Sequence, residues 1–210
     1  KDAPKKLAEV SLLKIKSGNI KVREKIRFGK YIWRVLDIQS NSAMLITEEV
    51  IVEKPYNDIQ SNSAMLITEE VIVEEPYNTD QEDITWEKST IRQYLNNEFY
   101  NTFSEEEKAM IKETDIVNSN NLEYGTSEDN NTKDKVFLLS IDEVNKYFKL
   151  GMSTKNMIAY NNGNACYWWL RSPGELPYSA ACVNTAGNID FSGSYISSEE
   201  GIRPALNLEF

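Results

Sequence analysis

The sequence predicts an α+β fold in which a mainly antiparallel sheet accompanies one block of short helices. Three observations carry this prediction. Short apolar runs bounded by turn residues, typical of strands, occur up to residue 80 and again after residue 135. Helical spacing of apolar residues gathers between residues 89 and 149. Strands and helices do not alternate regularly, and the sequence has no phosphate-binding glycine loop, so a doubly wound sheet is disfavoured.

An aromatic stretch, Cys166–Gly174, organises the predicted sheet. Its sequence, Cys-Tyr-Trp-Trp-Leu-Arg-Ser-Pro-Gly, is too short to span a membrane and ends in a Pro-Gly turn. Successive side chains of a strand point to opposite faces, so large groups would lie on both faces here. We therefore expect a central strand, with residues 179–184 returning antiparallel beside it.

The N-terminal part is expected to add further strands. Residues 1–28 form a basic extension whose residues 7–28 are expected to contain the first strands, and residues 29–210 form a single domain. Within that domain, residues 31–38 read as a strand and residues 43–52 as the strand that returns beside it.

A tandem duplication of 21 residues interrupts this pattern. Residues 37–57 recur at residues 58–78 with twenty identical positions, and the exception is Lys54 against Glu75. Such near-identity indicates a recent duplication or an error in the recorded sequence, because a solenoid has three or more drifted repeats. Two identical strands therefore compete for one position beside residues 31–38.

We expect the first copy to take that position, because a short turn connects it to Ile38. The second copy would then extend as an arm whose apolar face needs cover. A homodimer through the duplicated segment is therefore expected. The apolar face of that arm consists of Met65, Ile67, Val71 and Val73.

The helical block begins at Ser89, which is expected to cap a helix that reaches Tyr100. Capping boxes at Ser104 and Ser140 predict helices that end near Glu113 and Lys149. A buried strand is expected at residues 135–139. Residues 115–134 and 151–165 are expected to be surface loops.

The charge of the chain is unevenly distributed and limits its partners. Residues 1–30 carry a net charge of +7, whereas residues 31–210 carry −17. An acidic body disfavours nucleic acid, which needs clustered Lys and Arg. We expect the basic end to be a solvated tether, with contact to an anionic surface as the alternative.

The composition also excludes several kinds of chemistry. The sequence has no histidine and two cysteines, which excludes Ser-His-Asp and Cys-His catalysis, histidine metal sites and a four-thiolate zinc site within it. No run is long enough for a transmembrane helix. The chain begins at Lys1, so we expect that a signal peptide, a lipoprotein leader or another domain precedes it.

Four side chains are the candidate ligand-binding residues: Trp168, Trp169, Arg171 and Arg203. The two guanidinium groups would face an anionic or hydroxyl-rich ligand, and an indole ring would stack on a sugar. The alternative, which we favour, is structural. In that case the tryptophans pack in the core, and each arginine lies on a tryptophan or pairs with an acid such as Glu87.

No metal site and no cofactor are expected. The loop of residues 129–134 has oxygen ligands but lacks the glycine and the final glutamate of an EF-hand. Cys166 and Cys182 bracket the Pro-Gly turn, and either a disulfide or two buried thiols would fit that spacing.

Several motifs resemble a bacterial family described as a domain of unknown function, over residues 29–208. They are Trp-Trp-Leu-Arg-Ser-Pro-Gly (168–174), Gly-Ile-Arg-Pro-Ala-Leu (201–206), Trp33–Asp37, Ile84–Glu87, Ser89–Arg92 and Lys135–Ser140. The tryptophan-rich strands and the terminal Gly-x-Arg-Pro strand are more distantly similar to the C-type-lectin-like fold. That fold is shared by lectins and formylglycine-generating enzymes, so the likeness implies a lectin-like domain and leaves its function open.

The resemblance and the absent histidine favour a non-catalytic binding domain, extracellular or in the cell envelope, for a protein or carbohydrate ligand. One alternative is an enzyme of the formylglycine-generating type that uses Cys166 or Cys182 as a reactive thiol. Another is a structural module of a longer chain.

Overall fold

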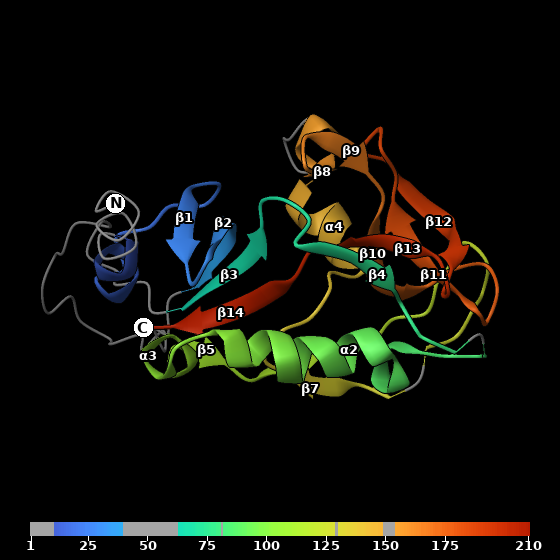
Figure 1. Ribbon diagram of the computed structural model, residues 1–210, viewed down its shortest axis with the longest axis horizontal. Coiled ribbons are helices and arrows are strands. Elements are labelled where there is room, and N and C mark those ends of the chain that lie inside the picture. Colours follow the sequence, from blue (N-terminus) through green and yellow to red (C-terminus); the bar gives the residue numbers. More distant parts are fainter. Residues whose placement is uncertain (1–10, 40–62, 81, 129, 149–153) are drawn as a thin grey trace, which may run out of the picture.

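A computed structural model describes residues 11–39, 63–80, 82–128, 130–148 and 154–210 (Figure 1). The described strands form two five-stranded sheets and two short hairpins, and short helices accompany them. The predicted α+β class with mainly antiparallel strands is therefore confirmed. Among the described residues, no helix is long and apolar enough to cross a membrane.

The first sheet is antiparallel throughout and has the strand order β1-β2-β3-β14-β5. It lies on the left in Figure 1. Its strands are β1 (Lys25–Phe28), β2 (Tyr31–Gln39), β3 (Ser63–Thr68), β14 (Ala205–Glu209) and β5 (Ile111–Lys112).

The second sheet has the order β12-β11-β10-β13-β4, so the aromatic strand β10 is central, as predicted. Strand β11 returns antiparallel beside β10, whereas β13 runs parallel to it. The strands are β12 (Ile189–Tyr195), β11 (Ser179–Val183), β10 (Trp168–Pro173), β13 (Glu199–Ile202) and β4 (Val73–Pro76).

Two chain segments cross together from one sheet to the other. Strand β3 continues through residues 69–72 into β4, and β13 continues through Arg203 and Pro204 into β14. Because β3 pairs with β14 and β4 pairs with β13, the two segments run antiparallel across the whole crossing. We call this region the crossover.

The close approach of the strands at the crossover requires glycine at position 201. A Cβ atom at this position would lie 2.4 Å from the side chain of Val71 and 2.7 Å from the carbonyl oxygen of Tyr167. Both distances are far shorter than van der Waals contact, so only glycine lets the strands approach this closely.

The helices lie against these sheets. The stretch from Thr90 to Thr102 is continuously helical and passes from α2 (Thr90–Tyr94) through a π-helical turn, η3 (Leu95–Phe99), to η4 (Tyr100–Thr102). It runs beneath both sheets in Figure 1. Further elements are η2 (Trp86–Lys88), α3 (Glu105–Lys108), α4 (Ile141–Phe148), η5 (Thr154–Asn156), β6 (Thr114–Ile116), β7 (Thr132–Asp134), β8 (Ala159–Asn161) and β9 (Asn164–Cys166).

All three predicted helix caps are present. The Ser89 side chain accepts a hydrogen bond from the Arg92 amide. Ser104 and Glu107 form a reciprocal capping box, and Ser140 and Glu143 form another. These bonds satisfy amide groups that a first helical turn leaves without partners.

Several boundary predictions were wrong. Residues 159–166, part of an expected surface loop, form the paired strands β8 and β9. Residues 11–16 are helical rather than extended. Helix α3 ends at Lys108, because the chain turns into β5, which pairs with β14. Residues 135–139 are buried as expected but form only one bridge, between Phe137 and Ala205, so they are not a regular strand.

Residues 63–68 of the second copy of the duplication form β3 and lie in the first sheet. Strand β3 pairs with β2 on one side and with β14 on the other. Met65 and Ile67 are therefore buried and do not form an exposed arm. The prediction that the first copy takes this position lies partly outside the described residues, but its consequence for the second copy was wrong. The second copy pairs through β4 with β13 and leads directly to η2, and these contacts accompany its place beside β2.

Candidate functional site

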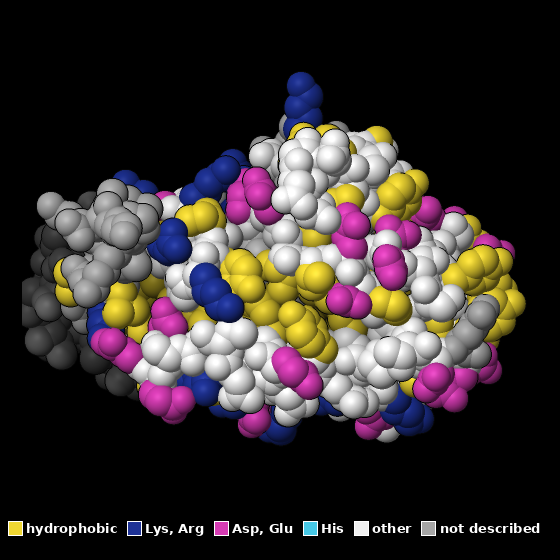
Figure 2. All heavy atoms as spheres, viewed as in Figure 1, with side chains coloured by type: hydrophobic (Ala, Val, Ile, Leu, Met, Phe, Trp, Pro, Cys, Tyr) yellow, Lys and Arg dark blue, Asp and Glu magenta, His cyan; other side chains and the backbone are white. Residues whose placement is uncertain are grey.

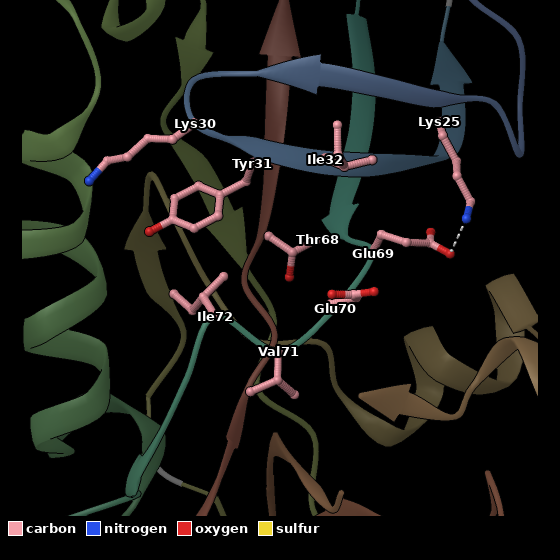
Figure 3. Close-up of a pocket in the computed structure, with 9 residues that line it drawn as sticks. All are labelled: Lys25, Lys30, Tyr31, Ile32, Thr68, Glu69, Glu70, Val71 and Ile72. Atoms are coloured by element: carbon pink, nitrogen blue, oxygen red, sulfur yellow. Dashed lines mark ion pairs between the residues drawn. The ribbon is translucent and has the colours of Figure 1, made fainter. Parts of the chain in front are cut away.

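A hollow opens beside the crossover, between the β1–β2 hairpin and residues 68–72 (Figure 3). Its volume of about 400 Å³ lies in the usual range of small-molecule sites, ~300–1,000 Å³. We call it the crossover hollow. It is lined by Lys25, Lys30, Tyr31, Ile32, Thr68, Glu69, Glu70, Val71 and Ile72.

Two buried oxygen atoms of this hollow are left unsatisfied. Thr68 is 1% exposed, and its Oγ1 has no hydrogen-bond partner among the described residues. The Oε2 atom of Glu69 is likewise buried and without a partner there. Burying a polar group without a hydrogen bond costs roughly 1–3 kcal/mol, so both atoms favour a site that a ligand completes.

The charges around the hollow have both signs. The Glu69 carboxylate forms ion pairs with Lys25 at 2.9 Å and with Arg34 at 2.5 Å. Burial would raise the pKa of Glu69, but these two partners outweigh burial and hold the pKa below its ordinary value. Among the side chains drawn in Figure 3, the one ion pair joins Lys25 to Glu69, so Glu70 is left without a cationic partner there.

The apolar part of the hollow comes from Tyr31, Val71 and Ile72. The Tyr31 ring is half-buried and packs against Phe99 with the ring centroids 5.4 Å apart. Burial raises the pKa of the Tyr31 hydroxyl, so it stays protonated near neutral pH and can donate a hydrogen bond.

Arg203, one of the ligand-binding candidates from the sequence, bonds to the main chain of Thr68, which lines the hollow. Its Nε donates to the carbonyl oxygen of Thr68 at 2.8 Å, and its guanidinium lies over the rings of Trp168 and Phe148 at 5.0 and 5.8 Å. Burial lowers the pKa of Arg203 to about 10. Its Nη1 atom has no hydrogen-bond partner among the described residues.

Trp168 and Trp169 lie in the core. Both are fully buried, and their indole nitrogens donate to the carbonyl oxygens of Met157 and Glu75, each at 2.9 Å. Tyr77 meets Trp169 edge to face. These contacts are the ones expected from the structural alternative, and stacking on a ligand stays a prediction.

Arg171 is buried and held by protein groups on every side. It donates to the carbonyl oxygens of Leu138 at 2.7 Å and Val117 at 3.1 Å, and it pairs with Glu143. The acid partner is therefore Glu143 and not Glu87. The capping box at Ser140 could have identified Glu143 from the sequence, because the same carboxylate closes that box.

A smaller hollow of about 230 Å³ lies between residues 119–123 and α4. We call it the amide hollow. The Nδ2 group of Asn121 ties this loop to the carbonyl oxygens of Pro173 and Phe191. Residues 121–126 and 173–175 therefore lie together. The buried Oδ1 atom of Asn145 in its lining has no partner among the described residues.

The two cysteines are free thiols. Burial raises the pKa of Cys166 to about 11 and that of Cys182 to about 12. A reactive thiol needs a lowered pKa, so both environments disfavour the thiol-enzyme alternative. No cluster of acidic, cysteine or histidine residues suited to a metal ion occurs in the described ranges.

Two residues of the loop considered for calcium, Asn131 and Asp134, accept hydrogen bonds from protein groups. Asp134 is buried and accepts hydrogen bonds from Trp86, Arg92 and Thr132, at 2.9, 2.7 and 2.7 Å respectively. Asn131 accepts from the Asn118 amide. Asp134 therefore holds this part of the chain to η2 and α2.

Comparison with known proteins gives one match. A family model described as a domain of unknown function (DUF6273) matches residues 61–210. The match begins within the second copy of the duplication rather than at residue 29. No curated protein and no solved structure matches the chain.

Proposed function

Since the chain belongs to the DUF6273 family of domains of unknown function, we propose its role from the crossover hollow: a non-catalytic domain that binds a carbohydrate there. The observation that carries the proposal concerns Thr68, a residue that is 1% exposed and lines the hollow. Its hydroxyl lacks a hydrogen-bond partner among the described residues.

The chemistry of the lining favours a neutral ligand with many hydroxyl groups. Lys25 and Lys30 oppose Glu69 and Glu70, so a strongly charged ligand would meet repulsion from one pair. A sugar hydroxyl both donates and accepts. It can donate to Glu70 and to the free Oε2 atom of Glu69, and it can accept from a lysine. The apolar face of a sugar ring would pack on Tyr31 and Ile72.

The proposal includes no catalytic step. Both thiols have raised pKa values, and the chain has no histidine. We also propose that the domain acts outside the cell or in the envelope, and that its fold is a distant relative of the C-type-lectin-like fold. The tryptophan-rich β10 and the Gly-Ile-Arg-Pro stretch support that likeness. Fractionation of the producing cells tests the location.

A glycan and peptide array followed by calorimetric titration tests the binding proposal. The critical variant is Thr68→Val together with Thr47→Val, because residue 47 repeats residue 68. Valine has nearly the same shape, and removing an unsatisfied hydroxyl leaves stability unchanged or raises it. We expect a glycan to be retained and its affinity to fall about tenfold in this variant, the loss of one hydrogen bond.

A matched control separates the crossover hollow from the amide hollow. Glu70→Gln with Glu49→Gln should weaken binding, whereas Glu123→Gln in the amide hollow should leave it unchanged. Retention of peptides but no glycan would contradict the carbohydrate assignment. Weakened binding in the Glu123 variant alone would move the site to the amide hollow.

A further inference from the structure

We propose that the ligand of the crossover hollow is an extended, unbranched oligosaccharide that continues from that hollow into a second hollow beside α2. The inference rests on the carbohydrate function proposed above and specifies the length and the path of the sugar chain. The second hollow has a volume of about 240 Å³, and we call it the helix hollow. Its lining includes Glu75, Thr79, Thr90, Tyr94 and Ile202.

The two hollows are neighbours along one segment of the chain. Val71 and Ile72 line the crossover hollow, and β4 begins at the next residue and carries Glu75 into the lining of the helix hollow. The amide of Ile72 also donates to the carbonyl oxygen of Ile202 at 2.9 Å, so a residue of one hollow is bonded to a residue of the other.

The spacing along this segment sets the length of a ligand that fills both hollows. Glu75 follows Ile72 by three positions, which corresponds to a rise of ~10 Å along a strand. A single sugar ring is shorter than this distance. A ligand that reaches from one hollow into the other therefore has several sugar units.

Two tyrosines form an aromatic wall that runs from one hollow to the other. Tyr31 lines the crossover hollow, and Tyr94 lines the helix hollow. Both rings are half-buried and pack against Phe99, with the ring centroids 5.4 and 6.4 Å away respectively. Figure 2 shows apolar side chains gathered over the middle of this face, above the helical stretch of residues 90–102. Each tyrosine ring can pack on the apolar face of a sugar, so the wall offers stacking positions for two separate units.

The polar groups along this path suit a neutral chain with hydroxyl groups at intervals. Burial raises the pKa of Tyr31 and of Tyr94, so both phenol groups stay protonated near neutral pH and can donate to a sugar oxygen. Glu75 adds a carboxylate that accepts from a sugar hydroxyl. Among the described residues that line the helix hollow there is no lysine or arginine, so a polyanionic chain would meet only repulsion from Glu75 there.

Calorimetric titration with size-graded sugars tests the length of the ligand. The probes are linear neutral cello-, xylo-, manno- and chito-oligosaccharides, each from the monosaccharide to the hexasaccharide. In the series that binds, the affinity should rise about tenfold or more once the chain is long enough to reach Tyr94, and should then level off. Equal affinity for the shortest bound sugar and for the hexasaccharide overturns the extended path and leaves the proposed function standing. Binding of no sugar on the array or in titration overturns both.

Substitution of Tyr94 separates the two hollows. Tyr94→Ala should lower the affinity for the hexasaccharide about tenfold and change that for the shortest bound sugar by less than about twofold. Tyr31→Ala should weaken the binding of both. Tyr100→Ala is the matched control, because Tyr100 is a half-buried tyrosine of the same helical stretch that lines neither hollow, and it should leave both affinities unchanged.

Two outcomes of this comparison overturn the inference. One is an unchanged affinity of Tyr94→Ala for sugars of every length. The other is a peptide from the array whose binding, unlike that of any sugar, is weakened by Tyr94→Ala, because it would assign the helix hollow to a protein partner.

A second readout uses the unsubstituted chain. With ring-labelled tyrosine, the hexasaccharide should shift the NMR signals of both Tyr31 and Tyr94, whereas the shortest bound sugar should shift those of Tyr31 alone. Tyr31→Phe and Tyr94→Phe assign the signals, because each keeps its ring and removes one tyrosine. Tyr94 signals that do not move with the hexasaccharide contradict the extended path even if Tyr94→Ala fails to fold.

Discussion

The Nε atom of Arg203 donates a hydrogen bond to the carbonyl oxygen of Thr68 over 2.8 Å, at the point where two paired strands pass from one sheet to the other. Thr68 also lines the crossover hollow, and its buried hydroxyl has no hydrogen-bond partner among the described residues. One arginine therefore holds both the crossing of the sheets and a wall of the candidate site.

Two substitutions of Arg203 should separate its packing from its charge. Arg203→Ala leaves a cavity between Trp168 and Phe148 and should cost about 3–5 kcal/mol. Arg203→Met fills much of that volume and removes a buried charge that has no carboxylate partner among the described residues, so it should cost about 1–2 kcal/mol. Denaturant unfolding measures both. Equal losses would show that charge, not volume, dominates.

Trp169→Ala should lower the free energy of unfolding by about 3–5 kcal/mol, because the side chain is fully buried on the central strand. Trp169→Phe should cost less, since it loses mainly the hydrogen bond to Glu75 and part of the ring. Urea melts give the values. A loss of less than about 1 kcal/mol in the alanine variant would revive the ligand-stacking role.

Alkaline pH should destabilise the fold partly through Cys182. Its folded pKa of about 12 lies above the ordinary value of 9.0, because burial disfavours the thiolate. The unfolded chain releases this proton first, so the stabilising contribution is complete below pH 9 and is lost as pH rises toward 12. Cys182→Ala should flatten the fall of stability between pH 9 and 10.5, measured by urea melts at each pH. An unchanged slope contradicts the assignment.

Removal of either copy of the duplication should leave a folded protein. Deleting residues 37–57 or residues 58–78 yields two chains that differ only by Glu75 or Lys54 opposite Glu200. The chain that keeps Lys54 should be more stable by about 0.5–1.5 kcal/mol. Thermal and urea unfolding compare them.

The deletions also test the expected homodimer. Both shortened chains should sediment as monomers, because neither carries a surplus strand that invites edge pairing. Association of the full chain alone would place the contact in the extra segment. Equal association of the full chain and both shortened chains would exclude a dimer contact through the extra segment.

The sequence by itself determined the local parts of this protein. The three serine caps, the central position of β10 and its antiparallel return to β11 follow from residues close together in the chain. Such features depend on short-range hydrogen bonds and on side-chain alternation, which a single sequence displays directly. The α+β class follows for the same reason.

Only the tertiary structure decided which copy pairs, what Arg203 holds and where a hollow opens. Two identical strands cannot be told apart locally, and the second copy lies in the sheet through contacts with β14 and β13, which are more than a hundred residues away. Likewise, Thr68 gave no signal in the sequence. Thr68 is buried because it pairs with Trp33 of β2 and its main chain bonds to Pro204 and Arg203, which are distant in the sequence. Its hydroxyl then has no partner among the described residues.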